Sequence, residues 1–257
     1  MSGELLDLVR ELRRRVVEDP DAFNASAHAK ARLSSRRVEL PEAETASRAI
    51  STHPGVSLDL KRQIFQKLAD EVAACQKCPL GKHRLKAVFG VGSPDAQVMF
   101  IGEGPGYEED HRGEPFVGKS GQLLDKILES IGLSRQTVYI ANIVKCHPMK
   151  ENDPELRGND RPPTPDEIAA CKPYLDRQIE VIAPKVIVTL GATPAKVLVA
   201  PGVSITAIRG QWREYSPAAG KTIKLLPTYH PAALLRNPDL KRDVWTDMKN
   251  LKKELES

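Results

Sequence analysis

The chain has 257 residues, of which 40% are hydrophobic and 28% are charged, and its formal net charge is +4. This balance is typical of a soluble globular protein with one domain and extensions, or with two small domains, and the mild positive excess permits a polyanionic partner. No apolar stretch approaches the length of a membrane span, and the N-terminus lacks the pattern of a secretory signal. We therefore expect no membrane association and a cytoplasmic location.

The first 57 residues differ in composition from the rest of the chain. Apolar residues at helical spacing predict an amphipathic helix over residues 4–17: Leu5, Leu8, Val9, Leu12 and Val16. Residues 19–57 are rich in Ala, Ser, Pro and charge, which predicts a poorly ordered extension, with a docking peptide for a partner as the alternative. Residues 1–57 carry nine basic and nine acidic residues, so the whole positive excess belongs to residues 58–257.

From residue 58 onward, helical and strand-like patterns alternate. A helix over 58–75 leads to the first cysteines, and four short apolar runs follow at 97–102, 137–142, 185–191 and 222–230. Helical patterns separate the runs at 120–132, 164–183 and 193–200. Alternation of this kind predicts an α/β fold with a four-stranded, mostly parallel sheet, whose strands are buried on both faces.

Polar residues follow the ends of these predicted strands. The first run ends in Gly102-Glu103-Gly104-Pro105-Gly106, the second at Asn142, the third at Gly191 and the last at His230. In parallel sheets, ligands bind outside the carboxyl ends of the strands. The sequence therefore predicts that Glu103, Asn142 and His230 converge on one edge of the sheet.

Four cysteines form a candidate metal site: Cys75, Cys78, Cys146 and Cys171. The Cys-x-x-Cys spacing of the first pair is typical of metal ligands, and four thiolates can hold zinc or a four-iron cluster. The second pair is split by 24 intervening residues, which breaks the usual zinc-knuckle pattern and mildly favours a cluster. Four unrelated buried cysteines are the remaining alternative.

Several motifs resemble those of the family 4 uracil-DNA glycosylases, the thermostable iron–sulfur type. They are "CQKCPLGKHR", "GEGPGYEEDHRGEPFVGKSG", "VYIANIVKCHP" and "PTYHPAALLRNP", in the family's order within residues 70–250. The resemblance implies a three-layer α/β/α fold and a [4Fe-4S] cluster on the four cysteines. It also implies a monomeric, monofunctional hydrolase that cleaves the N-glycosidic bond of deoxyuridine in DNA and leaves an abasic site in base-excision repair. Uracil-containing DNA is the implied partner, and residues 1–57 would contact a repair or replication partner.

The resemblance also implies roles for single residues in a pocket that receives the flipped base. Phe116 would stack on uracil; the alternative is an ordinary core position. Asn142 would bind O4 and N3–H of uracil; the alternative is a turn-forming residue. His230 faces O2 of the departing base, a role that a helix-capping His can also fill. Glu103 orients water or stabilises the sugar cation, and Gly102 and Gly104 let the backbone approach the substrate.

The segment after His230 resembles the family's DNA-intercalating loop. Leu234 and Leu235 would supply an apolar wedge, and Arg236 would contact phosphate. The acids of 108–110 are interpreted as a solvated turn and helix cap, and the long segment 147–165 as a surface loop. A non-catalytic DNA-binding or polymerase-associated module of the same fold is the alternative function. A nucleotide hydrolase is disfavoured because no Walker lysine follows the Gly-rich turn.

Overall fold

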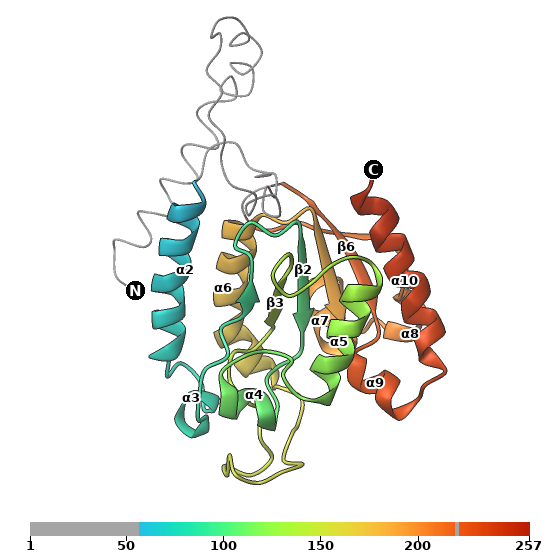
Figure 1. Ribbon diagram of the computed structural model, residues 1–257. Coiled ribbons are helices and arrows are strands. Elements are labelled where there is room, and N and C mark those ends of the chain that lie inside the picture. The colour runs from blue at the N-terminus through green and yellow to red at the C-terminus, as the bar shows by residue number, and fades with distance from the viewer. Residues whose placement is uncertain (1–56, 219–220) are drawn as a thin grey trace, which may run out of the picture. The chain divides into compact units, whose positions relative to one another are not determined.

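Four parallel strands form the centre of a six-stranded sheet in the computed structural model, which describes residues 57–218 and 221–257 (Figure 1). The sheet has the order β1-β3-β2-β4-β6-β5. Its parallel strands are β2 (Val98–Gly102), β3 (Tyr139–Asn142), β4 (Val186–Leu190) and β6 (Ile223–Thr228). The helix predicted for 4–17 and nearly all of the predicted extension lie outside the described residues.

The prediction of four strands was wrong in number, because two antiparallel strands complete the sheet. β1 (Val91–Gly92) pairs with β3, and β5 (Arg213–Tyr215) pairs with β6. These edge strands contain only two and three residues, too few to produce a periodic apolar pattern. The α/β class and the mostly parallel centre are confirmed.

Helices cover both faces of the sheet, which confirms the three-layer α/β/α architecture. One face carries α2 (Leu58–Ala73), α6 (Pro165–Ile182) and α7 (Ala192–Leu198), and the other carries α5 (Lys119–Ser130), α9 (Pro231–Arg236) and α10 (Leu240–Leu255) (Figure 1). Three short helices lie in the connections: α3 (Leu80–His83), α4 (Tyr107–Arg112) and α8 (Ile205–Ile208). No helix in the part of the chain that the structure describes is long and apolar enough to cross a membrane.

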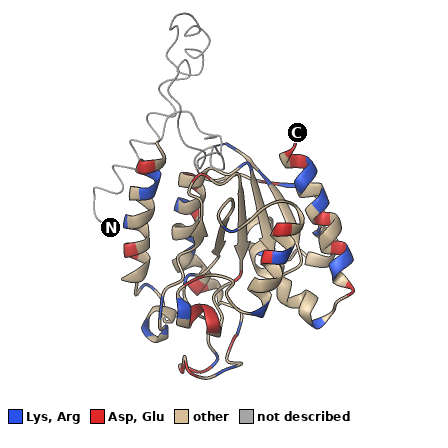
Figure 2. Ribbon diagram, in the orientation of Figure 1, with Lys and Arg blue, Asp and Glu red and all other residues tan. Residues whose placement is uncertain are grey.

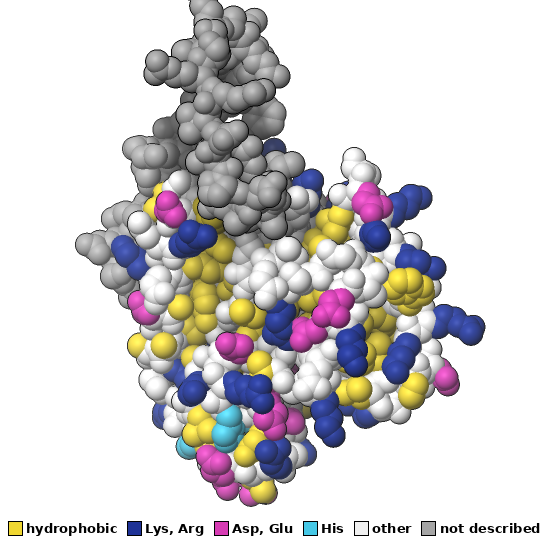
Figure 3. All heavy atoms as spheres, viewed as in Figure 1, with side chains coloured by type: hydrophobic (Ala, Val, Ile, Leu, Met, Phe, Trp, Pro, Cys, Tyr) yellow, Lys and Arg dark blue, Asp and Glu magenta, His cyan; other side chains and the backbone are white. Residues whose placement is uncertain are grey.

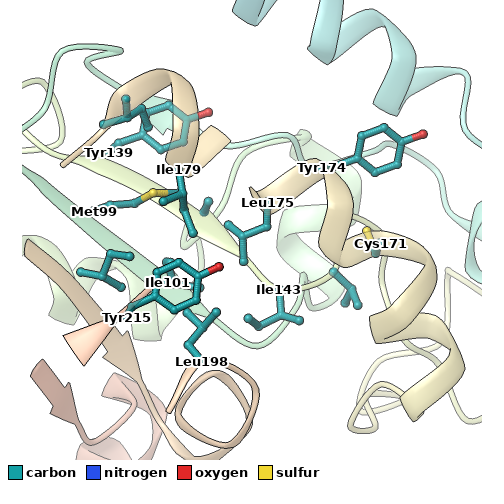
Figure 4. Packing of buried hydrophobic residues seen from close by; sticks show 14 of the residues in the cluster. Met99, Ile101, Tyr139, Ile143, Cys171, Tyr174, Leu175, Ile179, Leu198 and Tyr215 are labelled. Carbon is teal, nitrogen blue, oxygen red and sulfur yellow. The ribbon is translucent and has the colours of Figure 1, made fainter. Parts of the chain in front are cut away.

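Each strand contributes alternate side chains to two separate cores. In β2, Met99 and Ile101 join the core under α2 and α6, whereas Val98 and Phe100 join the core under α5 and α10. Figure 4 shows the first core, with Met99 beside Tyr139 and Ile179, and with Cys171 at the far end of the cluster on α6. Burial on both faces explains why the central strands read as continuous apolar runs.

Helix α6 has clear signals at both ends. Thr164 caps its N-terminus by accepting a hydrogen bond from the Glu167 N–H at 3.3 Å, and Pro165 occupies the first turn. The helix ends at Ala183, which has a left-handed φ of 49°. These signals explain why the predicted range of 164–183 is nearly that of the observed helix, which carries Cys171.

The crossovers on either side of β2 run in opposite directions. From β2 the chain passes through α5 on one face to reach β3, and it then passes through α6 on the other face to reach β4, beyond β2. Such a reversal opens a crevice at the carboxyl ends of the strands, where α/β proteins bind their ligands. The predicted site residues follow these same strand ends.

Candidate active site and cysteine pocket

Three predicted pocket residues meet at the end of β2. Gly102 is in register with Asn142 of β3. A Cβ on Gly102 would lie 2.4 Å from Asn142 Oδ1 and 2.6 Å from the ring atom Cζ of Phe116. Only a glycine leaves room there, so the two side chains pack over its Cα. Gly102, Asn142 and Phe116 therefore line one small space at the carboxyl edge of the sheet.

The Asn142 side chain has an unsatisfied oxygen in this space. It is 2% exposed, and Oδ1 has no hydrogen-bond partner among the described residues. The backbone carbonyl of Asn142 accepts a hydrogen bond from Nζ of the buried Lys145 at 2.9 Å. A buried amide oxygen without a partner is costly, and an unsatisfied group of this kind calls for an explanation such as a ligand donor.

Phe116 is a neighbour of both the Asn142 amide and the His230 imidazole. The Phe116 and His230 rings stack with centroids 5.4 Å apart at an interplanar angle of 30°. Phe116 is 5% exposed and has a left-handed φ of 55°, which is unusual for a residue with a bulky side chain. Stacking of Phe116 on a base stays a prediction, and burial of the ring equally suits the alternative of a core residue.

His230 is held as a neutral imidazole with a defined tautomer. It is the N-cap residue of α9, and its Nδ1 accepts a hydrogen bond from the Ala232 N–H at 3.1 Å. Burial, together with the charge of Arg236, lowers the pKa of His230 to about 4. With Nδ1 accepting, the proton of the neutral ring is on Nε2, which is left to act as a donor.

Glu103 directly follows the last residue of β2, and its carboxylate accepts a hydrogen bond from Thr193 Oγ1 on α7. Thr193 was missed in the sequence, where it looked like an ordinary residue of the first helical turn. Gly104 also has a packing role, and its predicted approach to the substrate stays a prediction. A Cβ there would lie 2.8 Å from Val144 Cγ2, so its lack of a side chain lets the turn pack on the segment after β3.

The segment after His230 divides its apolar residues between core and surface. Leu234 is 1% exposed and packs in the core under α5 and α10, whereas Leu235 is 48% exposed, and Arg236 is also exposed. Successive residues of a helix point about 100° apart, which separates two adjacent leucines. The structure therefore does not bring Leu234 to the surface, and Leu235 is the exposed apolar residue of the predicted wedge.

The four cysteines line one pocket. Cys146 and Cys171 are buried and Cys75 and Cys78 half-buried, and the pocket wall also contains Arg84, Lys145 and Tyr174. In residues 57–218 and 221–257, no three His, Cys, Asp or Glu side chains are placed to hold a single metal ion. The common pocket, which gathers all four thiols of the chain, is the observation that fits a larger cluster.

Hydrogen-bond donors surround the buried sulfur atoms. Arg84 Nη1 donates to Cys146 Sγ at 2.8 Å, and the backbone N–H of Lys145 donates to Cys171 Sγ at 3.2 Å. Burial raises the pKa of the Cys146 thiol to about 12 and also raises that of Cys171. Thiolates at these positions therefore need a bound cationic group, and the nearby donors suit the negative charge of thiolate ligands.

The acids of α4, coloured red in Figure 2, are only in part the solvated turn and helix cap that were predicted. Glu109 caps the helix and Glu108 is half-exposed. Asp110 is fully buried and accepts the backbone N–H groups of Leu85 and Lys86 at 3.1 and 3.2 Å. Glu109 accepts from the N–H groups of Val117 and Gly118 at 3.0 and 3.2 Å. Both carboxylates bind backbone groups from distant segments, which no local sequence pattern reveals.

The segment 147–165 is only partly a surface loop. His147 is fully buried next to Cys146, and its Nε2 lies 2.6 Å from Asp160 Oδ1. Asn159 is 3% exposed, and a β-bridge joins Met149 to Asp160. The two ends of the segment are therefore joined to each other, and His147 and Asn159 are buried.

Comparison with known proteins identifies the family to which this fold and edge site belong. The chain belongs to the uracil-DNA glycosylase superfamily, whose family model matches residues 89–249. The type-4 uracil-DNA glycosylase of Sulfurisphaera tokodaii is 44% identical over 196 residues, which cover 73% of this chain and 83% of that protein. That of Thermotoga maritima is 43% identical over 195 residues, which cover 75% and 95%. The resemblance inferred from the motifs is thereby confirmed.

A part of a replication protein is also similar. The DNA polymerase of Bacillus phage SP01 is 34% identical over 154 residues, which cover 60% of this chain but only 15% of the polymerase. The type-4 enzymes are matched along most of their length, whereas the polymerase is matched along a small part.

Proposed function

We propose that this chain is a type-4 uracil-DNA glycosylase, a monofunctional hydrolase that removes uracil from DNA in base-excision repair and leaves an abasic site. Relatives of that name, at 43% and 44% identity over most of their length, support the assignment. The structural observation that carries it is the buried, unpartnered Oδ1 of Asn142 beside the Phe116 ring. A flat base with a donor at its edge is the chemistry that this pair can recognise.

Asn142 and Phe116 select the base. Uracil has a donor at N3–H and an acceptor at O4, so Asn142 Oδ1 accepts from N3–H while its Nδ2 donates to O4. Cytosine has the opposite pattern at both atoms and would leave both groups of the amide unpaired. The target nucleotide flips out of the helix to reach this pocket, and its base stacks on Phe116.

His230 and Glu103 act on the glycosidic bond. As the bond breaks, negative charge builds up on uracil O2, and the Nε2–H of the neutral His230 donates to it more strongly than in the ground state. Glu103, with one carboxylate oxygen held by Thr193, orients the attacking water or stabilises the positive charge on the sugar. Gly102 lets the base approach the end of β2, and Leu235 and Arg236 contact the DNA around the flipped nucleotide.

The four cysteines would hold a [4Fe-4S] cluster. When bound, the cluster would link three segments of the chain and contribute its binding free energy to folding. Arg84 Nη1 and the Lys145 N–H would donate to the ligating sulfurs of Cys146 and Cys171. We also propose that residues 58–257 are the catalytic domain, that residues 1–57 are an extension that contacts a repair or replication partner, and that the protein acts as a cytoplasmic monomer.

Cleavage of uracil-containing oligonucleotides tests the proposed activity. Wild-type protein is incubated with single- and double-stranded oligonucleotides that contain one deoxyuridine, and abasic sites are converted to breaks by alkali. We expect cleavage at uracil and none at cytosine. Asn142→Asp should weaken cleavage at uracil, because Nδ2 is lost as a donor to O4, and should admit some cytosine when the new carboxyl is protonated.

The same assay separates the enzyme from a non-catalytic module. The match to part of a phage DNA polymerase supports the second candidate function, a non-catalytic DNA-binding part of a replication assembly. Wild-type protein that binds DNA but makes no abasic site, with its cysteine pocket loaded, would favour the module and contradict the proposed activity.

A further inference from the structure

We infer that Arg135 and Glu109 are positioning residues that hold the Phe116 ring ready to stack on the flipped base. This inference rests on the proposed function and extends it to two charged residues that need not touch the substrate. The observations are the backbone conformation of Phe116, the hydrogen bonds on either side of it, and the space under its carbonyl.

Phe116 has a backbone conformation that needs outside support. Its φ of 55° lies in the left-handed region, where a Cβ crowds the following carbonyl oxygen. A bulky residue keeps such a conformation only where surrounding contacts determine it, and residues of this kind gather at functional sites. In the described part of the chain, Phe116 and Ala183 are the non-glycine residues with positive φ, and Ala183 ends helix α6.

Arg135 binds the backbone on the N-terminal side of the turn. Its Nη1 donates to the Pro115 carbonyl at 2.9 Å, and its Nη2 donates to the Phe116 carbonyl. Its Nε donates to Asp125 Oδ1 on α5 at 2.6 Å, which fixes the guanidinium plane. Arg135 is 19 residues from Phe116 in sequence, so this contact forms only in the folded domain.

Glu109 binds the backbone on the C-terminal side. Its Oε1 accepts the N–H groups of Val117 and Gly118 at 3.0 and 3.2 Å, and its Oε2 accepts the Gly106 N–H at 3.2 Å. One carboxylate thus ties the turn that follows Phe116 to the Gly-rich turn that follows Glu103. Together, Arg135 and Glu109 engage four consecutive residues, 115–118, by their backbone groups.

Gly121 lets helix α5 pack directly against the Phe116 carbonyl group. A Cβ at this position would lie 1.7 Å from the Phe116 carbonyl oxygen, so the first turn of α5 can approach the turn only with glycine there. The carbonyl is thereby held against the helix and toward Arg135. The ring on the other side of the same residue stacks on His230 and lies over Gly102. A ring fixed before the base arrives loses little freedom on binding, which raises affinity for the flipped state.

The experiment measures affinity for a flipped base without cleavage. The probe is a duplex with one 2′-fluoro-2′-deoxyuridine, whose glycosidic bond resists hydrolysis, and the reference is the same duplex with thymidine. Arg135→Gln should weaken binding to the probe about tenfold, the lower end of what base–aromatic stacking contributes, and leave the thymidine duplex unaffected. Arg135→Lys, which keeps the charge but loses the planar fork, should fall between the two.

A double-mutant cycle with Phe116→Ala shows whether the effect passes through the ring. Once the ring is gone, Arg135→Gln should cause no further loss of affinity for the probe. The matched control is Arg177→Gln, which removes an arginine–carboxylate pair of similar exposure, to Glu71 at 2.7 Å, and should leave binding unchanged. Single-turnover cleavage of deoxyuridine at saturating enzyme should fall less than affinity does.

Two results would overturn the inference. One is an unchanged affinity of Arg135→Gln for the probe, and the other is an equal loss with and without the Phe116 ring. If Arg135→Gln does not fold, Glu109→Gln passes through the same cycle with the same expectation. Wild-type protein that neither prefers the probe nor cleaves deoxyuridine would instead contradict the proposed function, so the two failures are distinguishable.

Discussion

The protonation state of His230 is set by a backbone hydrogen bond to its ring and by the surroundings of the ring. Its Nδ1 accepts from the Ala232 N–H, and burial with the charge of Arg236 lowers its pKa to about 4. In the unfolded chain its pKa returns to about 6.5. As pH falls below 6.5, the unfolded chain therefore binds a proton that the folded domain does not bind until about pH 4.

This difference predicts that His230 lowers the free energy of unfolding in mild acid. Between pH 6.5 and 4 the wild-type protein should lose stability relative to His230→Gln, by on the order of 1–2 kcal/mol at pH 5. Urea unfolding of both proteins at pH 7.5 and pH 5 measures this, and the contributions of the other histidines cancel in the difference. An equal loss for both proteins would contradict the lowered pKa of the His230 ring.

The sequence predicted the residues that end strands and missed those that support them. Asn142 and His230 were predicted as site residues because each follows an apolar run, and Phe116 because of its motif. Arg135, Glu109 and Thr193 hold other site residues from elsewhere in the chain. Arg135 and Glu109 bind backbone groups, and the Thr193 hydroxyl donates to the Glu103 carboxylate. Such contacts depend on the tertiary fold and leave no periodic or compositional signal.

Helix α9 shows how one element serves both core and surface. Its six residues begin at the His230 cap, and its register turns Leu234 inward and Leu235 outward. Leu234 and Leu235 were both predicted as wedge residues because the register of the helix was not known. The central strands and long helices were predicted well because their apolar patterns extend over several residues, whereas β1 and β5 were too short to detect.

The two leucines of α9 should therefore respond differently to truncation. Leu234→Ala should lower the free energy of unfolding by about 2–5 kcal/mol, because it leaves a cavity in the core under α5 and α10. Leu235→Ala should leave stability within about 0.5 kcal/mol and weaken excision from duplex DNA more than from single strands. Urea unfolding and cleavage assays on both substrates test this, and equal stability losses would contradict the observed register.

At the scale of the whole molecule, the cysteine pocket joins distant segments. Its four thiols come from the chain after α2, the chain after β3, and helix α6. The positive excess of the chain also lies in this domain, and α10 exposes five basic side chains along one side of the molecule (Figure 3): Lys241, Arg242, Lys249, Lys252 and Lys253. Both features belong to residues 58–257, the proposed catalytic domain.

Loss of one ligand should affect the entire domain. Cys171→Ser should yield protein without the brown colour and broad visible absorbance of an iron–sulfur cluster, and its thermal unfolding midpoint should fall, because binding free energy contributes to folding. Iron analysis of wild-type protein prepared without oxygen should give four iron per chain. Stoichiometric zinc in place of iron would contradict the cluster.

Removal of the N-terminal segment should leave the chemistry intact. Every predicted site residue lies within residues 58–257, so deletion of residues 1–57 should change single-turnover cleavage of short oligonucleotides by less than about tenfold. A deletion of residues 1–56 is the matched control, because it retains the Ser57 hydroxyl that accepts the Leu60 N–H at 3.2 Å and caps α2. A larger loss with both deletions would assign part of the active site to the extension.

Lys145 connects the cysteine pocket with Asn142 at the end of β3. Its backbone N–H donates to Cys171 Sγ, and its side chain donates to the Asn142 carbonyl at 2.9 Å and to Gln178 Oε1 at 2.6 Å. Where one residue is shared in this way, thermodynamic linkage is reciprocal. If a group in the cysteine pocket strengthens uracil binding by holding Lys145, bound uracil must tighten the retention of that group by the same factor. Equilibrium competition with a chelator, with and without the fluorinated duplex, measures that factor, so retention of the bound group would report damage recognition.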